Sequence, residues 1–276
     1  MRFARLSLVV SALVALASGT YACGGSDSAN ADPSQDGDGG TKVEGNNPNA
    51  RKLAPLPSRG STIAIAPDDS RVVAANRDAG TVTVFAVDWS SSPPSLERIA
   101  EVPVGAEVSQ VVINPNGEYA LALSRAEQKL VRIDDLRGTP KAGASVKTGS
   151  EPTGLALSPF GDTAWVANWV DGTVQVVKPA SMEVTTTVDL NAVLAASGRL
   201  GNIAGRPALA HPRSIAITNN GNNLDDDEHA YVTDFYAHQK EPLAADGSNA
   251  DVAKAAVVYE ISLKDPTQVK IIELPP

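Results

Sequence analysis

The sequence is poor in cysteine, aromatic residues and positive charge, and each shortage excludes a class of protein. A single cysteine among 276 residues leaves no internal disulfide to stabilise the chain. Aromatic residues make up 4% of the chain against 42% hydrophobic residues, so the core must consist of aliphatic side chains, which favours sheets. Acidic residues outnumber basic ones by 32 to 23 without any Lys/Arg cluster, so nucleic acid and anionic lipid headgroups are poor candidate partners.

The first 22 residues have the three parts of an export signal. Arg2 and Arg5 precede an apolar stretch over residues 6–17, and small residues follow before a cleavage point. The stretch is too short for a helix that spans a membrane. Removal of residues 1–22 leaves 21 basic and 32 acidic residues, a net charge of −11. We therefore expect an exported, acidic mature protein.

The only cysteine, Cys23, lies where a bacterial lipoprotein signal is cut. Ala22 fits the lipobox, whereas Thr20 and Tyr21 depart from it. We predict that Cys23 carries a lipid that anchors the chain to the outer or cytoplasmic membrane of the cell envelope. The alternative is cleavage by ordinary signal peptidase after Ala17 or Ala22.

Residues 23–50 are predicted to be a disordered linker. The segment consists of Gly, Ser, Asp, Asn and Pro with almost nothing apolar, so it cannot bury enough surface to offset the entropy of ordering. The run Asp36-Gly37-Asp38-Gly39 lacks the ordered ligands and closing Glu of a calcium-binding EF-hand loop. A solvated tether is therefore the interpretation that we adopt.

The remaining chain, residues 51–276, repeats one pattern four times: an apolar run, a polar turn, a second apolar run that ends in a polar residue, and further runs. Equivalent positions fall at Ala66, Asn114, Ser158 and Thr218, which are 48, 44 and 60 residues apart. Period-2 apolar runs between tight turns predict four short antiparallel strands in each copy. Such a unit at this period is typical of a β-propeller blade, because stacked blades bury both faces of each sheet.

The predicted blades cover residues 61–104, 105–149, 150–190 and 212–276. In the third copy the expected strands are Thr153–Ser158, Thr163–Asn168, Thr173–Val177 and Met182–Leu190. In the fourth they are Arg213–Thr218, Ala230–Phe235, Ala255–Ile261 and Val269–Leu274. We expect small residues on the crowded innermost strands, namely Ala64, Ala66, Gly154 and Ala156.

The second strands carry a family resemblance. They read Val73-Ala74-Ala75-Asn76, Trp165-Val166-Ala167-Asn168 and Tyr231-Val232-Thr233-Asp234, and Glu151-Pro152-Thr153-Gly154 opens the third copy. From Ser61 to Leu274 the chain resembles the YVTN β-propeller repeats of bacterial and archaeal surface proteins. The second copy departs with Tyr119-Ala120-Leu121-Ala122, and the fourth ends in Asp instead of Asn. The resemblance implies a scaffold and no particular reaction.

Propellers of this family usually have about seven blades, so the resemblance implies that the four blades belong to a larger ring. The prolines of Leu53-Ala54-Pro55-Leu56-Pro57 make this segment poor material for a strand that closes a ring. We favour a chain that is the amino-terminal part of a longer protein. The alternatives are a small closed ring and an open arc that a second chain completes.

Two long connections are expected side by side on one rim, Asn191–Pro212 between blades and Tyr236–Lys254 inside the fourth blade. Long loops on a rigid scaffold often carry function. We predict a site for a protein or envelope component there, formed by Arg199, Arg206, His211, Arg213, Tyr236, His238 and Lys240. The alternative is that both are tolerated surface insertions.

A third long loop, Asn219–His229, is expected on the opposite rim. Its acidic run includes Asp225 and Asp227, and carboxylate oxygens are ligands that Ca²⁺ prefers. The spacing matches no calcium motif, so a solvated acidic loop is the main interpretation and a calcium site the alternative. No other cofactor is expected.

Motifs for catalysis are missing from the sequence. It has neither a Cys-x-x-Cys-His haem site, nor a His-Glu-x-x-His zinc site, nor a Gly-x-Ser-x-Gly elbow. We therefore expect a non-catalytic exported scaffold. Propellers of similar repeat include lactone hydrolases and redox subunits, so the alternative is a propeller enzyme completed beyond residue 276, with His211 and His238 as the histidines it would need.

Overall fold

The computed structural model describes residue 52, residue 54 and residues 56–199, 209–222 and 224–274. The predicted export signal, Cys23, the linker over residues 23–50 and Arg206 lie outside these residues. Pro48–Pro276 form one compact unit.

Four antiparallel sheets, one for each copy of the repeat, make up this unit. Blade one contains β1 (Ile63–Ile65), β2 (Arg71–Asn76), β3 (Thr81–Asp88) and β4 (Ser95–Pro103). Blade two contains β5 (Val108–Ile113), β6 (Ala120–Ser124), β7 (Lys129–Asp134) and β8 (Lys141–Lys147). Blade three contains β9 (Pro152–Leu157), β10 (Ala164–Asn168), β11 (Thr173–Lys178) and β12 (Glu183–Asp189). Blade four contains β13 (Pro212–Ile217), β14 (His229–Asp234), β16 (Lys254–Ser262) and β17 (Val269–Leu274).

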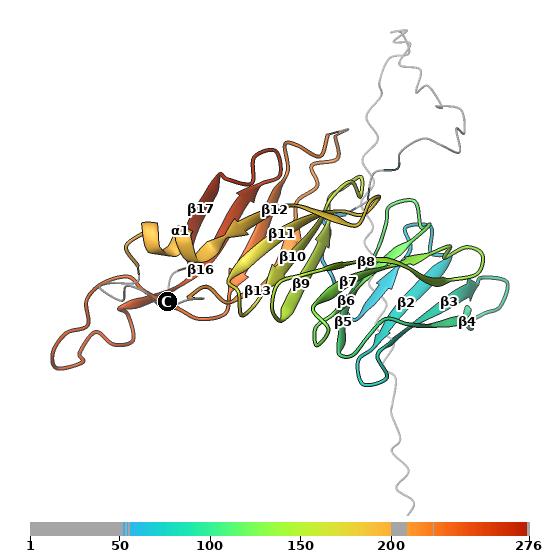
Figure 1. Cartoon of the computed structure of the whole chain (residues 1–276), viewed down its shortest axis with the longest axis horizontal. Coiled ribbons are helices and arrows are strands. Elements are labelled where there is room, and N and C mark those ends of the chain that lie inside the picture. The colour runs from blue at the N-terminus through green and yellow to red at the C-terminus, as the bar shows by residue number, and fades with distance from the viewer. Residues whose placement is uncertain (1–51, 53, 55, 200–208, 223, 275–276) are drawn as a thin grey trace, which may run out of the picture. The chain divides into compact units, whose positions relative to one another are not determined.

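The prediction of an all-β chain with four four-stranded propeller blades is confirmed. The four sheets follow one another in chain order across Figure 1, and the inner strands β1, β5, β9 and β13 contact one another in sequence. Gly154 on β9 shows why small residues are needed there. A Cβ at this position would lie 3.1 Å from the side chain of Ile215 on the next inner strand.

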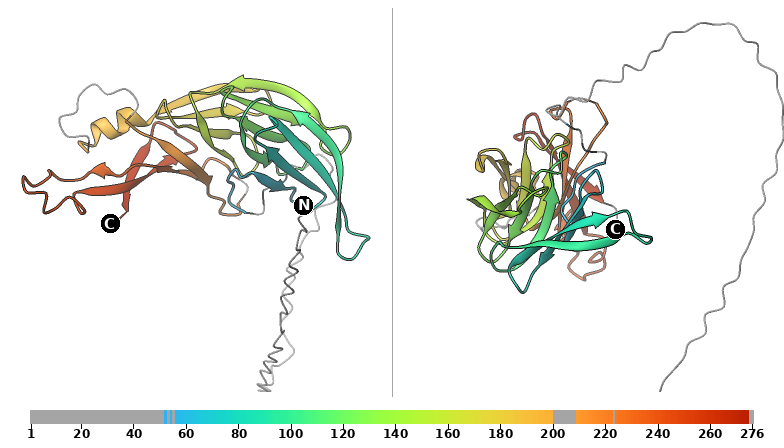
Figure 2. Two further views of the ribbon diagram at one scale, coloured as in Figure 1. Left: turned by 90° about the horizontal axis from the view of Figure 1, so that it is seen from below. Right: turned by 90° about the vertical axis from the view of Figure 1, so that its right-hand side faces the viewer.

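In blades three and four the strand ends lie within one residue of the predicted ones, and one short strand was not predicted. The last strand of blade three ends at Asp189 instead of Leu190, and β14 ends at Asp234 instead of Phe235. Blade four also gains a short fifth strand, β15 (His238–Gln239), which pairs with the beginning of β16. The second insertion therefore begins as an extension of the β14–β16 hairpin, and its loop projects beyond the sheet (Figure 2).

The first insertion begins with a helix that the strand pattern did not predict, α1 (Leu190–Ala196). The carboxylate of Asp189 caps it by accepting a hydrogen bond from the backbone N–H of Ala192 at 3.1 Å. Leu190 and Leu194, four residues apart, are both buried.

Among the described residues no helix is long and apolar enough to cross a membrane.

Hydrophobic side chains from neighbouring sheets form the cores between the blades. Val84 packs with Val111 between blades one and two, and Trp165 packs with Tyr259 between blades three and four. Each fully buried aliphatic side chain contributes about 1.5–3 kcal/mol. The blades are therefore held together by the faces of their sheets.

The inner strand of blade one differs from the others in exposure. Ile63 and Ile65 on β1 are 53% and 59% exposed, whereas the equivalent Leu155 and Leu157 on β9 are 0% and 2% exposed. The difference arises because a preceding blade covers β9.

The segment that precedes blade one runs along the inner strands of the other blades. Ser58 forms an isolated β-bridge with Ile217 of β13, and Ser61 forms one with Val111 of β5. Between them, the N–H of Gly60 donates to the carbonyl of Leu155 on β9. Only glycine fits this approach, because an added Cβ would lie 2.7 Å from that carbonyl oxygen. The segment thus ties blades two, three and four together near the axis.

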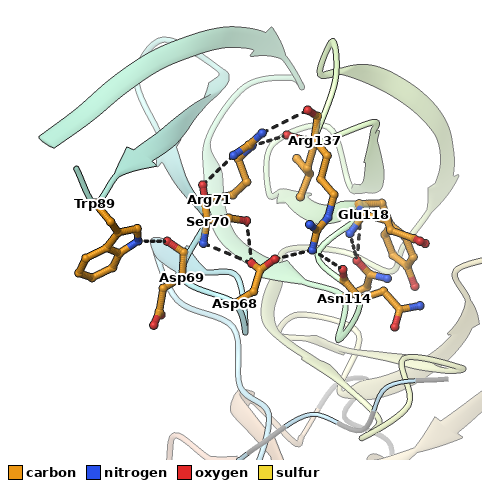
Figure 3. Close-up of polar contacts among 11 residues, drawn as sticks. Asp68, Asp69, Ser70, Arg71, Trp89, Asn114, Glu118 and Arg137 are labelled. Carbon is orange, nitrogen blue, oxygen red and sulfur yellow. Dashed lines mark hydrogen bonds and ion pairs between the residues drawn. The ribbon is translucent and has the colours of Figure 1, made fainter. Parts of the chain in front are cut away.

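On the rim formed by the turns between first and second strands, two arginines join blades one and two (Figure 3). Arg137 donates to the carboxylate of Asp68 at 2.5 Å and to the backbone carbonyl of Asn116 at 3.0 Å. Arg71 donates to the backbone carbonyl of Leu136 at 2.8 Å. These polar contacts lie on the rim opposite to the candidate functional site.

Candidate functional site

On the other rim, a repeated pair of side chains bridges consecutive blades. One member, the corner residue, directly follows the second strand of a blade, and the other, the entry residue, directly precedes the next inner strand. Arg77 pairs with Glu107 at 3.4 Å between blades one and two. Arg125 pairs with Glu151 at 2.5 Å between blades two and three. The repeat therefore places an Arg–Glu ion pair at its first two junctions.

The entry glutamates are held in an unusual backbone conformation. Glu107 and Glu151 have φ angles of 54° and 49°, in the left-handed region that costs a non-glycine residue about 1–2 kcal/mol. The backbone carbonyl groups of both glutamates accept hydrogen bonds from corner residues. The backbone N–H of Arg125 donates to the carbonyl of Glu107 at 3.1 Å, and the N–H of Trp169 donates to that of Glu151 at 3.0 Å.

At the third junction the ion pair is replaced by an aromatic pair. The corner residue is Trp169 and the entry residue is His211, and their rings meet edge to face with centroids 5.3 Å apart. Their positions are equivalent to those of the ion pairs, because the next corner residue, Phe235, donates its N–H to the carbonyl of His211 at 3.0 Å. This substitution marks the third junction as different from the other two.

Further rings extend this pair into a cluster. The ring of Phe235 lies 4.8 Å from that of Trp169, and the ring of Tyr236 lies 4.9 Å from that of His211. Phe235 and Tyr236 are 56% and 52% exposed. We call Trp169, His211, Phe235 and Tyr236 the aromatic rim. Edge-to-face contacts favour one relative orientation of these rings.

Asp234, at the end of β14, is the foundation of the aromatic rim. Its Oδ1 accepts hydrogen bonds from the backbone N–H groups of His211 at 3.2 Å and Tyr236 at 3.3 Å. Its Oδ2 accepts one from the buried hydroxyl of Tyr259 at 2.7 Å and lies 2.9 Å from Nε2 of His238. One carboxylate thereby joins both insertions to the sheet.

These contacts change the acidity of the groups involved. Burial favours the neutral form of Asp234, but the contacts from His238 and Tyr259 outweigh it and hold the pKa of Asp234 below its ordinary value of 3.8. Burial, together with the charge of Asp234, raises the pKa of Tyr259. Asp234 is therefore ionised and Tyr259 protonated near neutral pH.

Beside the aromatic rim lies a cavity of about 270 Å³ lined by residues of all four blades. We call it the channel-mouth cavity, because Ser109, Thr153 and Ser214 of the inner strands contribute to its wall. Its charged lining consists of Arg77, Arg125 and Arg213. The guanidinium carbon of Arg213 lies 5.6 Å from the centroid of the Trp169 ring, so cavity and rim share a wall.

Of the residues predicted for this rim, the structure brings together His211, Arg213 and Tyr236. His238 lies beneath them instead, because β15 directs its ring onto Asp234, where it is 8% exposed. Lys240 is exposed farther along the same insertion.

Arg199 forms an ion pair with Glu273 on β17. Arg199 is therefore bound to the outer strand of blade four, and among the described residues it contacts no ring of the aromatic rim.

The acidic loop uses carboxylates in hydrogen bonds within the chain. Asp227 accepts from the side-chain amides of Asn220 and Asn222, which lower the pKa of Asp227, and Asp225 accepts from the N–H of Phe160 at 3.0 Å. Within the described ranges no group of three or more His, Cys, Asp or Glu side chains is arranged to hold a metal ion. A calcium site at Asp225 and Asp227 stays a prediction.

Sequence reasoning missed Trp169, Phe235 and Asp234 as parts of the site. The signal that would have found them is the series of corner residues, which runs Arg77, Arg125, Trp169, Phe235 along the four copies. A change from arginine to aromatic residues midway through a repeat indicates a local demand that the repeat does not share.

Comparisons with known proteins give no family. No known protein family matches the chain, and no curated protein matches it. Among solved structures, it is similar to a protein from Lactobacillus plantarum, with 17% identity, a TM-score of 0.48 and coverage of 79% of this chain and 54% of that one. It is also similar to the periplasmic gluconolactonase of Pseudomonas aeruginosa, with 14% identity, a TM-score of 0.44 and coverage of 79% and 58%. A third similar structure is hydrazine synthase of Kuenenia stuttgartiensis, with 16% identity, a TM-score of 0.44 and coverage of 82% and 68%.

The chain thus spans between 54% and 68% of the length of these solved structures. At this level of similarity the activities named for them are properties of those proteins.

Proposed function

We propose that the chain is an exported β-propeller scaffold that binds a protein or another envelope component through its aromatic rim, without chemistry of its own. In this proposal a lipid on Cys23 is the contact with the membrane, and nucleic acid is not a partner. The localisation rests on the sequence of residues 1–23, and the binding surface rests on the third blade junction.

The replacement of the repeated ion pair by the half-buried rings of Trp169 and His211 is the observation that supports this function. Packing alone does not require Trp169 and His211, because Arg–Glu pairs bridge the other two junctions. Exposed Phe235 and Tyr236 add apolar surface beside them. Trp, Tyr and Arg are the residue types that dominate binding energy at interfaces. Rings that are already fixed lose little entropy when a partner binds.

Site-specific photocrosslinking tests the proposal in cells that make the protein. A photoreactive phenylalanine analogue replaces Tyr236, and irradiation is expected to give one adduct of discrete mass. The matched control places the same analogue at Trp89, an aromatic residue that is 61% exposed on the loop after β3, on the opposite rim. Adducts of equal yield from both positions, or none from position 236, would contradict binding through the aromatic rim.

The contact between Asp234 and His238 favours a second candidate, a propeller enzyme of the lactone-hydrolase or redox type. A carboxylate that holds an imidazole is a common support for a general base. A panel of lactones assayed with the wild type, His211→Ala and His238→Ala tests its hydrolytic form. Hydrolysis that both substitutions abolish would support an enzyme, whereas hydrolysis unchanged by both would exclude these histidines as catalysts.

A further inference from the structure

Positive charge in the channel-mouth cavity is only partly neutralised. Arg125 contacts the carboxylates of Glu151 at 2.5 Å and Glu107 at 3.6 Å, and Arg77 contacts Glu107 at 3.4 Å. Arg213 has no carboxylate within ion-pair distance among the described residues. The cavity lining therefore has three guanidinium groups, of which two are paired with the carboxylates of Glu107 and Glu151, although the whole chain has a net charge of −9.

The excess charge arises at the same junction as the aromatic rim. Register aligns Val108, Pro152 and Pro212 as the first paired residues of their inner strands. The next residues are Ser109, Thr153 and Arg213. Blade four thus adds a cation at a position where the preceding blades have hydroxyls.

The entry residue changes in the opposite sense at this junction, from glutamate to His211. The corner arginine is lost here as well, to Trp169, so the Arg–Glu pair of the earlier junctions is absent and Arg213 is the one charge added. A cation without a carboxylate partner among the described residues leaves a site for an external negative charge.

The geometry of Arg213 suits an anion. Its guanidinium lies 5.6 Å from the centroid of the Trp169 ring, a cation–π contact that positions the group while its N–H donors stay available. A planar guanidinium presents paired donors that match a carboxylate or phosphate. Arg213 is exposed, so an ion reaches it from solvent without rearrangement of the blades.

A second cationic region of the chain shows the contrast. Cavities of about 540 and 630 Å³ lie beside Arg132 on the opposite rim. There Arg132 contacts the carboxylate of Asp134 at 2.6 Å, donates to the carbonyl of Pro179 at 3.2 Å and stacks 4.4 Å from the ring of Tyr119. The guanidinium of Arg132 is committed to neighbours within the chain, whereas that of Arg213 is not.

We infer that the channel-mouth cavity is a binding site for a carboxylate or phosphate anion, with Arg213 as its principal charge partner. The cavity volume of about 270 Å³ suits a small ion or a single acidic side chain. The anionic group is either a free small ion or an acidic group of the partner that binds the aromatic rim.

Binding of inorganic phosphate and of succinate to the mature chain tests the inference. Calorimetry and thermal melting are carried out at constant ionic strength, with chloride as the baseline, because general screening affects every surface charge. We expect saturable binding and a higher melting temperature with at least one probe. No saturable binding of either probe would overturn the inference.

Three variants assign the charge partner. Arg213→Gln is expected to weaken binding roughly tenfold or more, the loss of one charge-assisted interaction. Arg213→Lys keeps the charge, and its affinity is expected to lie between those of the wild type and Arg213→Gln. The control is Arg98→Gln, which removes an exposed arginine on β4 paired with Glu101 at 3.1 Å and is expected to bind like the wild type. Equal affinity of Arg213→Gln and the wild type would also overturn the inference.

A competition experiment distinguishes the two sources of the anion. Excess succinate is added before irradiation of the chain that carries the photoreactive analogue at position 236. Loss of the adduct, absent with chloride at the same ionic strength, would assign the acidic group to the partner, and an unchanged adduct would assign it to a free ion. The calorimetry needs no partner, so failure of partner binding and failure of anion binding are separate results.

Discussion

The second strands of blades three and four both end in a polar side chain that hydrogen-bonds to the third strand. This side chain is a donor in blade three and an acceptor in blade four. In blade three the amide of Asn168 donates to Thr173 at 3.1 Å and to the side-chain oxygen of Gln175 at 3.3 Å. In blade four the equivalent Asp234 accepts from the hydroxyl of Tyr259, which occupies the position of Gln175. Donor and acceptor have exchanged places, and the carboxylate of Asp234 also accepts hydrogen bonds from the backbone N–H groups of both insertions.

The two blades also differ in the sheet face that points toward the next position in the chain order of blades, which we call the forward face. Trp165 on β10 is 1% exposed because blade four covers it, whereas the equivalent Tyr231 on β14 is half-buried. Ala167 and Thr233 form a second equivalent pair, of which the first is buried and the second exposed. The same repeat position is therefore core or surface according to its neighbour, and the residue type follows that difference.

The largest expected effect separates the two forward faces. Trp165→Ala should lower the free energy of unfolding by about 3–5 kcal/mol, because it leaves a cavity between two blades. Tyr231→Ala should lower it by about 1 kcal/mol or less, since the side chain has only partial contacts to lose. Urea denaturation of both variants measures the difference. Equal losses would mean that blade four is covered in solution.

The next largest effect distinguishes Asp234 from Asn168, the last residues of the two second strands. Asp234→Ala should lower the free energy of unfolding by about 3 kcal/mol, because it leaves the hydroxyl of Tyr259 and two backbone N–H groups without their acceptor. Asn168→Ala should cost about 1–2 kcal/mol, since one amide with two hydrogen bonds is lost. The same denaturation experiment compares them, and a smaller loss for Asp234→Ala would contradict its role as the foundation of both insertions.

A pH series sharpens the comparison of Asn168 with Asp234, because of these two strand-end residues only Asp234 is ionisable. The pKa of Asp234 is lowered on folding, so its contribution to stability is complete above its ordinary value of 3.8 and is lost as pH falls through the lower folded-state value. Asp234→Asn should therefore be less stable than the wild type by about 1 kcal/mol near neutral pH. The difference should shrink on acidification, and a constant difference would show that ionisation of Asp234 is not what stabilises the fold.

The strands of the blades were predictable because period-2 patterning and turn residues act locally. Third strands such as Thr173–Lys178 were placed to within a residue. Helix α1 was missed although its signal is local too, namely a capping Asp189 before Leu190 and Leu194. The strand pattern that ran into it masked the change of period.

The site was less predictable, because its geometry depends on register and on equivalence between blades. His238 was expected on the rim, but the pairing of β15 with β16 turns its ring inward, and nothing local in the loop sequence indicates that pairing. Trp169 looks like an ordinary turn residue until it is aligned with Arg77 and Arg125. Contacts across blade junctions are long-range, so only the assembled fold reveals them.

The smallest expected change in stability tests what the third junction is for. The double substitution Trp169→Arg and His211→Glu replaces the aromatic pair with the ion pair that bridges the other two junctions. Exposed ion pairs contribute about 0–1 kcal/mol, so the free energy of unfolding should change by about 1 kcal/mol or less. Crosslinking from position 236 should nevertheless be lost, because Phe235 and Tyr236 lose the rings that orient them. A variant that stays folded and keeps the adduct would show that the aromatic pair is a structural equivalent of the ion pair and that partners bind elsewhere.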